Sequence, residues 1–345
     1  MWERASDEQI LNELRKIFTE FYYTLIGDVH SSNFITSMDI LKSLIEKQST
    51  VLFTSLKYLE NGNEEEVKAI FQKVARRHKE LGISYKSMFT GIKVYINLLE
   101  NSKLGLKHYQ LEKLKGILEE TTAEEYIKGI LKDSIEFLYN ERKFRNATEY
   151  DHFVYDKITK HLEGIYNFLE NKNHTDYQSL SQSHTNCEVG RFLNGLPFDV
   201  MSFNNKYLGL HIKTIHKDIH TSTNDLISYI KNKKFEEAVA IAVRITEDVI
   251  TFLYNYGKLS LLWQENKDEV LAEYSRSMYG KNNLFILILS CEKDANVSKT
   301  VQANIKEILS KYLTKFDFIF YYENDYGKDI KILMSKNQNY FHISD

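Results

Sequence analysis

The sequence predicts a mainly α-helical fold that is followed by a small α/β region. Residues that interrupt helices are scarce, since the 345 residues include one proline, Pro197, and 14 glycines. Apolar residues recur at spacings of three and four through much of residues 7–275, as on the buried faces of amphipathic helices. Three short apolar runs of strand length follow after residue 283.

Length, charge and hydropathy restrict the class of protein. The chain is long enough for two or three domains. Its mean hydropathy is −0.42, and no apolar run approaches the roughly 18 residues that cross a bilayer, so we expect no membrane segment. The charged N-terminal residues MWERASDEQI and the low number of cysteines, Cys187 and Cys291, predict a cytoplasmic location. A net charge of −3 without a dense basic face gives no electrostatic basis for nucleic-acid binding.

Six helices are predicted in residues 1–145, the first predicted domain. They span residues 7–26, about 38–59, 64 to beyond 78, 84–100, 105–119 and about 121–143. Ser37 or Asp39 can cap the second helix, and a sequence typical of a capping box starts the last one at Thr121. The polar stretch over residues 142–150, RKFRNATEY, is the predicted boundary of this domain.

His78 is the candidate metal ligand of the first domain. It lies on or beside the apolar stripe of the third predicted helix, which we expect to end at Gly82 in a left-handed turn. A neutral imidazole at such a helix end can bind haem iron while its other ring nitrogen contacts a nearby acceptor. The residues alone leave open a structural histidine that binds no metal.

Residues 8–140 resemble the globin domain of globin-coupled sensors. The proximal motif of that family, H-x-x-I/L-G-I/L, is matched by His78, Leu81, Gly82 and Ile83. The distal motif, E/x-F-Y, is matched by Glu20, Phe21 and Tyr22, with the tyrosine 56 positions before the histidine.

This resemblance implies that His78 binds the iron of haem b and that Tyr22 donates a hydrogen bond to iron-bound O2. Tyr23 is the neighbouring alternative to Tyr22. The resemblance also places Leu44 and Gln48 over the distal side, where Gln48 is either a second donor or an exposed polar residue. Some members of the family bind no haem, which leaves a haem-free globin as the alternative.

Histidines are crowded in the second predicted domain, residues 150–275. Seven of the eleven lie there: His152, His161, His174, His184, His211, His216 and His220. His216 and His220 are four positions apart, so on a helix both imidazoles lie on one side and can bind one cation. The thiolate of Cys187 would be a third ligand.

Residues 150–275 resemble the chemoreceptor zinc-binding domain, a four-helix bundle with ligands in the order His, Cys, His, His. Its motif C-x-x-G-R/K-W is matched by Cys187, Gly190 and Arg191, with Phe192 in place of tryptophan. The resemblance implies a zinc site formed by His161, Cys187, His216 and His220. His152 is the alternative first ligand. Four protein ligands would leave no position for a substrate, so such a metal would stiffen or switch the bundle.

Residues 282–345 resemble the middle of a GGDEF diguanylate cyclase domain. Strands are predicted over 284–290, 316–322 and 329–334, with a helix over 297–313. The signature turn reads Glu323-Asn324-Asp325-Tyr326-Gly327, and the position of the metal-binding aspartate falls near Ser290. Without the acidic pair that holds Mg²⁺ and the glycines that admit a nucleotide, we expect no cyclase activity.

These resemblances together predict a cytoplasmic haem-based sensor of O2 or another diatomic gas. The signal would pass through a zinc-binding bundle to a degenerate cyclase-like output that contacts a signalling partner. The resemblance also implies a homodimer. Two alternatives stay open: a haem-free scaffold in a signalling complex, and a cyclase with residual activity.

Overall fold

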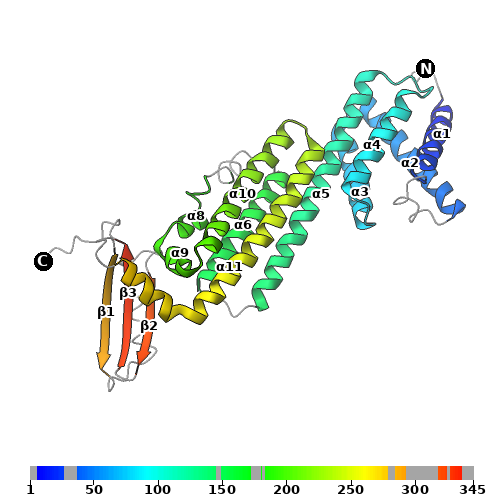
Figure 1. Ribbon diagram of the computed structural model, residues 1–345. Coiled ribbons are helices and arrows are strands. Elements are labelled where there is room, and N and C mark those ends of the chain that lie inside the picture. The colour runs from blue at the N-terminus through cyan, green and yellow to red at the C-terminus, as the bar shows by residue number, and fades with distance from the viewer. Residues whose placement is uncertain are drawn as a thin grey trace. The chain divides into compact units, whose positions relative to one another are not determined.

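The computed structural model confirms that the chain is mainly α-helical (Figure 1). The structure describes residues 6–26, 37–144, 149–171, 180, 183–278, 284–292, 318–324 and 327–335. Among these described residues, no helix combines the length and the apolar character needed to cross a membrane.

The contacts divide the chain into two compact units. The first contains residues 1–137, 165–173 and 222–246, and the second contains residues 138–164, 174–221 and 247–345. Both units therefore include parts of the long helices. The predicted domain boundary at residues 142–150 stays a prediction, because residues 145–148 lie outside the described part of the chain.

Five helices begin the chain and supply most of the first unit. They are α1 (Asp7–Ile26), α2 (Met38–Glu60), α3 (Glu64–Glu80), α4 (Tyr85–Glu100) and α5 (His108–Phe144). Their apolar faces form one core that includes Leu14, Leu52 and Leu114. Ser37 caps α2 by accepting a hydrogen bond from the Ile40 amide, so Ser37 is the capping residue rather than Asp39.

The prediction of two helices over residues 105–119 and 121–143 is wrong. One helix, α5, begins at His108 and continues without a break to Phe144. The Thr121 hydroxyl donates to the carbonyl oxygens of Ile117 and Leu118, one turn earlier in the same helix, so it does not cap a new helix. No proline interrupts the segment, and Gly116 keeps helical geometry within it.

The other helices of the described residues follow α5 in the chain. They are α6 (Glu149–Asn171), α8 (Glu188–Leu193), α9 (Leu196–Met201), the 3-10 helix η3 (Phe203–Asn205), α10 (Lys206–Lys231) and α11 (Phe235–Met278). Pro197 lies in the first turn of α9, where its missing amide proton costs no helical hydrogen bond.

Three strands form an antiparallel sheet after α11 (Figure 1). They are β1 (Leu284–Glu292), β2 (Phe318–Asn324) and β3 (Gly327–Ser335), in the order β1-β3-β2. The predicted hairpin is confirmed, because Asn324 of β2 pairs with Gly327 of β3. The helix predicted over 297–313 lies outside the described residues, as do residues 325 and 326 of the predicted signature turn.

Candidate metal centre

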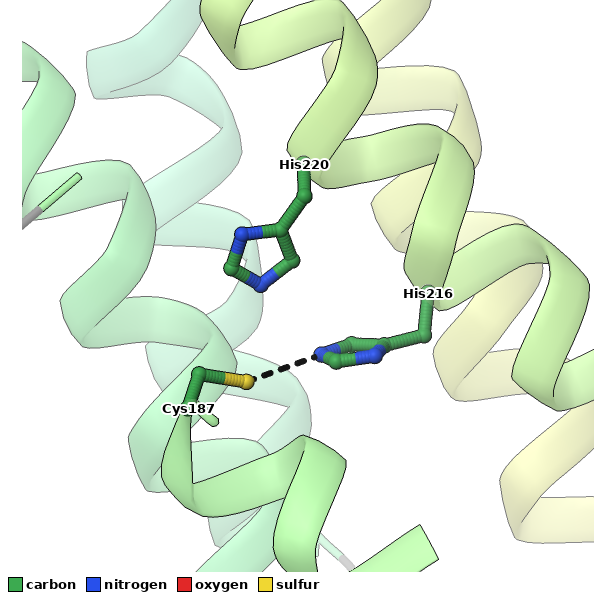
Figure 2. Close-up of side chains that lie close together, drawn as sticks. All are labelled: Cys187, His216 and His220. Carbon is green, nitrogen blue, oxygen red and sulfur yellow. Dashed lines mark hydrogen bonds between the residues drawn. The ribbon is translucent and has the colours of Figure 1, made fainter. Parts of the chain in front are cut away.

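Two elements of the second unit bring three metal-ligand side chains together (Figure 2). His216 and His220 lie one turn apart on α10 and project toward Cys187, which precedes the first residue of α8. The Cys187 sulfur lies 3.3 Å from Nε2 of His216. One potential ligand atom from each of the three residues lies within 4.8 Å of the others.

Burial favours the uncharged forms of His216 and Cys187 when no metal is bound. His216 is 2 % exposed and His220 is 7 % exposed. Burial and, to a smaller extent, the neighbouring imidazoles lower the pKa of His216 to about 3. Burial also raises the pKa of the Cys187 thiol, although hydrogen bonds from the Gly190 and Val189 amides partly oppose this shift. Neutral imidazoles and a thiol that a cation can deprotonate are suitable metal ligands, so this group can hold a metal ion.

Gly190 allows the chain before Cys187 to fold tightly against α8. A Cβ atom at this position would lie 1.7 Å from the carbonyl oxygen of His184, where no side chain fits. The Gly190 amide donates a hydrogen bond to the Cys187 sulfur over 3.1 Å. Glu188 pairs with Lys157 of α6, which ties this end of α8 to a second helix. The fold therefore requires glycine at the last position of the C-x-x-G pattern, because a side chain there would clash with the backbone.

An aromatic cluster surrounds Phe192 of α8. Phe192 is 2 % exposed, and its ring stacks on Tyr150 with the centroids 5.6 Å apart. It also contacts Phe153, Phe198 and Tyr256 edge-on at centroid distances from 5.9 to 6.2 Å. The phenylalanine that replaces the tryptophan of the motif thus fills a buried position between α6, α9 and α11.

The structure separates the two candidates for a fourth ligand. The ring centroid of His161 lies 5.0 Å from that of His220, and burial, with a smaller contribution from His220, lowers its pKa to about 3. Part of the His161 residue nevertheless keeps contact with solvent. His152, on the same helix, is exposed. His161 is thus beside the metal-ligand group.

In the first unit, His78 has the hydrogen bond expected of an oriented imidazole. Its Nδ1 lies 2.7 Å from the carbonyl oxygen of Val74, one turn earlier in α3. When Nδ1 carries the proton and donates it to this oxygen, Nε2 is the basic nitrogen of the ring. The residue is half-buried. Gly82 follows with a φ of +78°, which confirms the predicted left-handed turn after the helix.

Tyr22, the predicted distal residue, is 8 % exposed within an aromatic cluster. Its ring centroid lies 5.4 Å from that of Phe21 and 6.4 Å from that of Phe18. Its hydroxyl forms no hydrogen bond with any other residue that the structure describes, and burial raises its pKa to about 12. Tyr23, the alternative, is 57 % exposed. The hydroxyl of Tyr22 therefore remains available as a donor.

The other two residues predicted on the distal side, Leu44 and Gln48, are both half-buried on α2. Leu44 packs against the apolar core of the first unit. The role of Gln48 as a second donor stays a prediction.

No family model, curated protein or solved structure matches this chain in comparisons with known proteins.

Proposed function

We propose that the chain is a gas sensor of the globin-coupled type that holds Zn²⁺ in its second unit. The convergence of Cys187, His216 and His220 on one point is the observation that carries the metal-binding part of this proposal.

The donor set favours zinc over harder cations. One sulfur and two or three imidazole nitrogens match the mixed N/S ligands of structural zinc sites, whereas Mg²⁺ and Ca²⁺ select oxygen ligands. His161 supplies a further imidazole beside His220. Because all these donors belong to the protein, the ion would act on the fold by joining α6, α8 and α10, and would have no role in substrate turnover.

Metal analysis of the purified full-length chain tests this proposal. We expect about one zinc ion per chain, and we expect Cys187→Ala and His161→Ala to lose most of it. His152→Ala is the matched control, because His152 lies exposed on the same helix as His161. Zinc content that is insensitive to Cys187→Ala would exclude this site. Equal loss in the two histidine variants would exclude His161 as the specific fourth ligand.

Gas sensing by haem is the second part of the proposal, and two observations on the first unit favour it. The Val74 carbonyl accepts a hydrogen bond from Nδ1 of His78 in the tautomer that directs Nε2 to a metal. The Tyr22 side chain is 8 % exposed and its hydroxyl has no hydrogen-bond partner among the described residues, so this hydroxyl could serve a ligand. When bound, haem b would supply the iron that binds O2 or another diatomic gas.

Within this function the protein's own groups have separate roles. His78 would hold the iron from the proximal side, and Tyr22 would donate to the gas on the distal side, where Leu44 and Gln48 would also lie. A gas can shift the helices only through different affinities for two arrangements of the protein. The sheet after α11 would belong to a cyclase-like output that contacts a signalling partner, and the chain would act as a homodimer.

The absorption spectrum after haem supplementation tests the sensing function. We expect a Soret band in the full-length chain, its loss in His78→Ala and its retention in His108→Ala, because His108 is exposed at the start of α5. A colourless wild-type protein would favour the haem-free scaffold instead. Incubation with GTP and Mg²⁺ is expected to yield no cyclic dinucleotide, and any product would overturn the assignment of the output as inactive.

A further inference from the structure

Two hydrogen bonds connect His78 to helix α5. Across the turn at Gly82, the amide of Ile83 donates to the carbonyl oxygen of His78 over 3.1 Å. The hydroxyl of Tyr126, on α5, donates to the carbonyl oxygen of the same Ile83 over 2.5 Å. Tyr126 is 6 % exposed, so little water competes for this contact. Ile83 is therefore hydrogen-bonded through its amide to His78 and through its carbonyl oxygen to Tyr126 of α5.

Two contacts on the other side of the turn hold α3 against the same stretch of α5. Arg76 donates two hydrogen bonds to Glu125, each over 3.2 Å, with Nε and one terminal nitrogen bound to different carboxylate oxygens. The Lys79 side chain crosses α5 at Gly129, where a Cβ atom would lie 1.4 Å from its Nζ. Positions 76, 79 and 83 are thus all in contact with residues 125–129.

We propose that Tyr126 is a positioning residue for His78, holding the end of α3 so that the imidazole keeps a fixed orientation toward the group it binds. This proposal rests on the proposed haem-binding function. The contacts lie both before and after position 78, so a displacement of this end of α3 requires either a movement of α5 or the rupture of these contacts. The hydroxyl thereby couples the predicted iron ligand to a helix of 37 residues.

The variant Tyr126→Phe removes the hydroxyl and keeps the ring. In the haem-loaded full-length chain we expect a lower iron–histidine stretching frequency in the resonance Raman spectrum of the ferrous protein. We also expect haem transfer to apomyoglobin to become about five-fold faster, the factor that one hydrogen bond of ordinary strength contributes. Tyr109→Phe is the matched control, because Tyr109 lies on the same helix and is 62 % exposed.

An unchanged stretching frequency and rate of haem transfer in Tyr126→Phe would overturn the proposal, even if the variant melted at a lower temperature. A wild-type chain that takes up no haem would refute the gas-sensing function instead. In that case amide hydrogen exchange at residues 78–83 tests the positioning role of Tyr126. Faster exchange in Tyr126→Phe alone would support the positioning role, and exchange equal to that of Tyr109→Phe would refute it.

Discussion

The Sγ atom of Cys187 lies 3.3 Å from Nε2 of His216, although 28 residues separate them in the chain. Both side chains belong to neutral groups when no metal is present, since burial lowers the pKa of the imidazole and raises that of the thiol. When two uncharged ligand groups lie this close together, a cation can bind between them with the release of the thiol proton.

The stability of the metal-free protein should depend on the buried imidazoles. The pKa values of His161 and His216 are lowered to about 3 in the fold, against about 6.5 in an unfolded chain. Between these values the unfolded state binds more protons, so the free energy of unfolding is largest above pH 6.5 and decreases as the pH falls toward 3. Urea unfolding in the presence of a chelator, repeated from pH 8 to pH 4, measures this slope.

The matching control is the double variant His161→Gln, His216→Gln, which lacks both imidazoles. Its unfolding free energy should change less over the same pH range. A slope equal to that of the wild type would show that other groups cause the acid destabilisation.

Replacement of Gly190 by alanine should damage the metal centre through the backbone. The new Cβ would have to displace the carbonyl of His184, because it would otherwise lie 1.7 Å from that oxygen. We expect a loss of about 1–3 kcal/mol in the free energy of unfolding and weaker zinc binding. Chemical denaturation and metal titration measure the two effects.

Gly116→Ala is the control for this variant. Gly116 lies within α5 and has no atom within 4 Å of the Cβ that alanine would add. Alanine there should be neutral or stabilising by up to about 1 kcal/mol. Similar losses at both positions would argue against the steric explanation for Gly190.

Truncation of the Phe192 ring should destabilise the second unit. Phe192 is 2 % exposed and contacts four other aromatic rings, so Phe192→Ala should cost about 3–5 kcal/mol through lost burial and a residual cavity. Phe192→Leu should cost less, because it leaves a smaller cavity. Thermal denaturation of both variants checks this order, and equal melting temperatures would contradict it.

The Tyr22 hydroxyl should matter to bound gas and little to the fold. In haem-loaded protein, Tyr22→Phe should release O2 about ten-fold faster, since one hydrogen bond to the gas is lost. The same variant without haem should be as stable as the wild type, because the hydroxyl has no hydrogen bond to lose within the described residues. Stopped-flow displacement of O2 and thermal melting measure the two properties.

Tyr23→Phe provides the comparison, because Tyr23 is 57 % exposed one position further along α1. It should leave the rate of O2 release unchanged. If Tyr23→Phe accelerated release more than Tyr22→Phe, the assignment of the distal donor would be wrong.

The helical fold was predictable because its signals are local. Proline and glycine are scarce, and apolar spacing located α1 to α4 within a few residues of their observed bounds. The position of Gly82 likewise identified the end of the His78 helix. The capping signal at Thr121 misled, because a threonine hydroxyl can equally bond to a carbonyl one turn earlier, and packing in the fold then decides between the two.

The candidate metal centre was predictable only in part. A spacing of four placed His216 and His220 on one face of a helix, but nothing local relates either of them to Cys187 or His161. Cys187 and His161 were grouped with these two histidines through the resemblance to the chemoreceptor zinc-binding domain. Tyr126 gave no signal at all, since its partner is a backbone carbonyl 43 positions away. Contacts of this kind depend on how helices pack and leave no pattern in the sequence.

The ligand group of Figure 2 also has a consequence for folding. Cys187 and His220 enclose a segment of 32 residues, and an ion shared between them would act as a reversible cross-link. Like a disulfide, it would reduce the number of conformations open to the denatured chain, and the benefit grows slowly with the size of the loop. Unlike a disulfide, this metal cross-link could form under reducing conditions, and a chelator that competes for the metal could remove it.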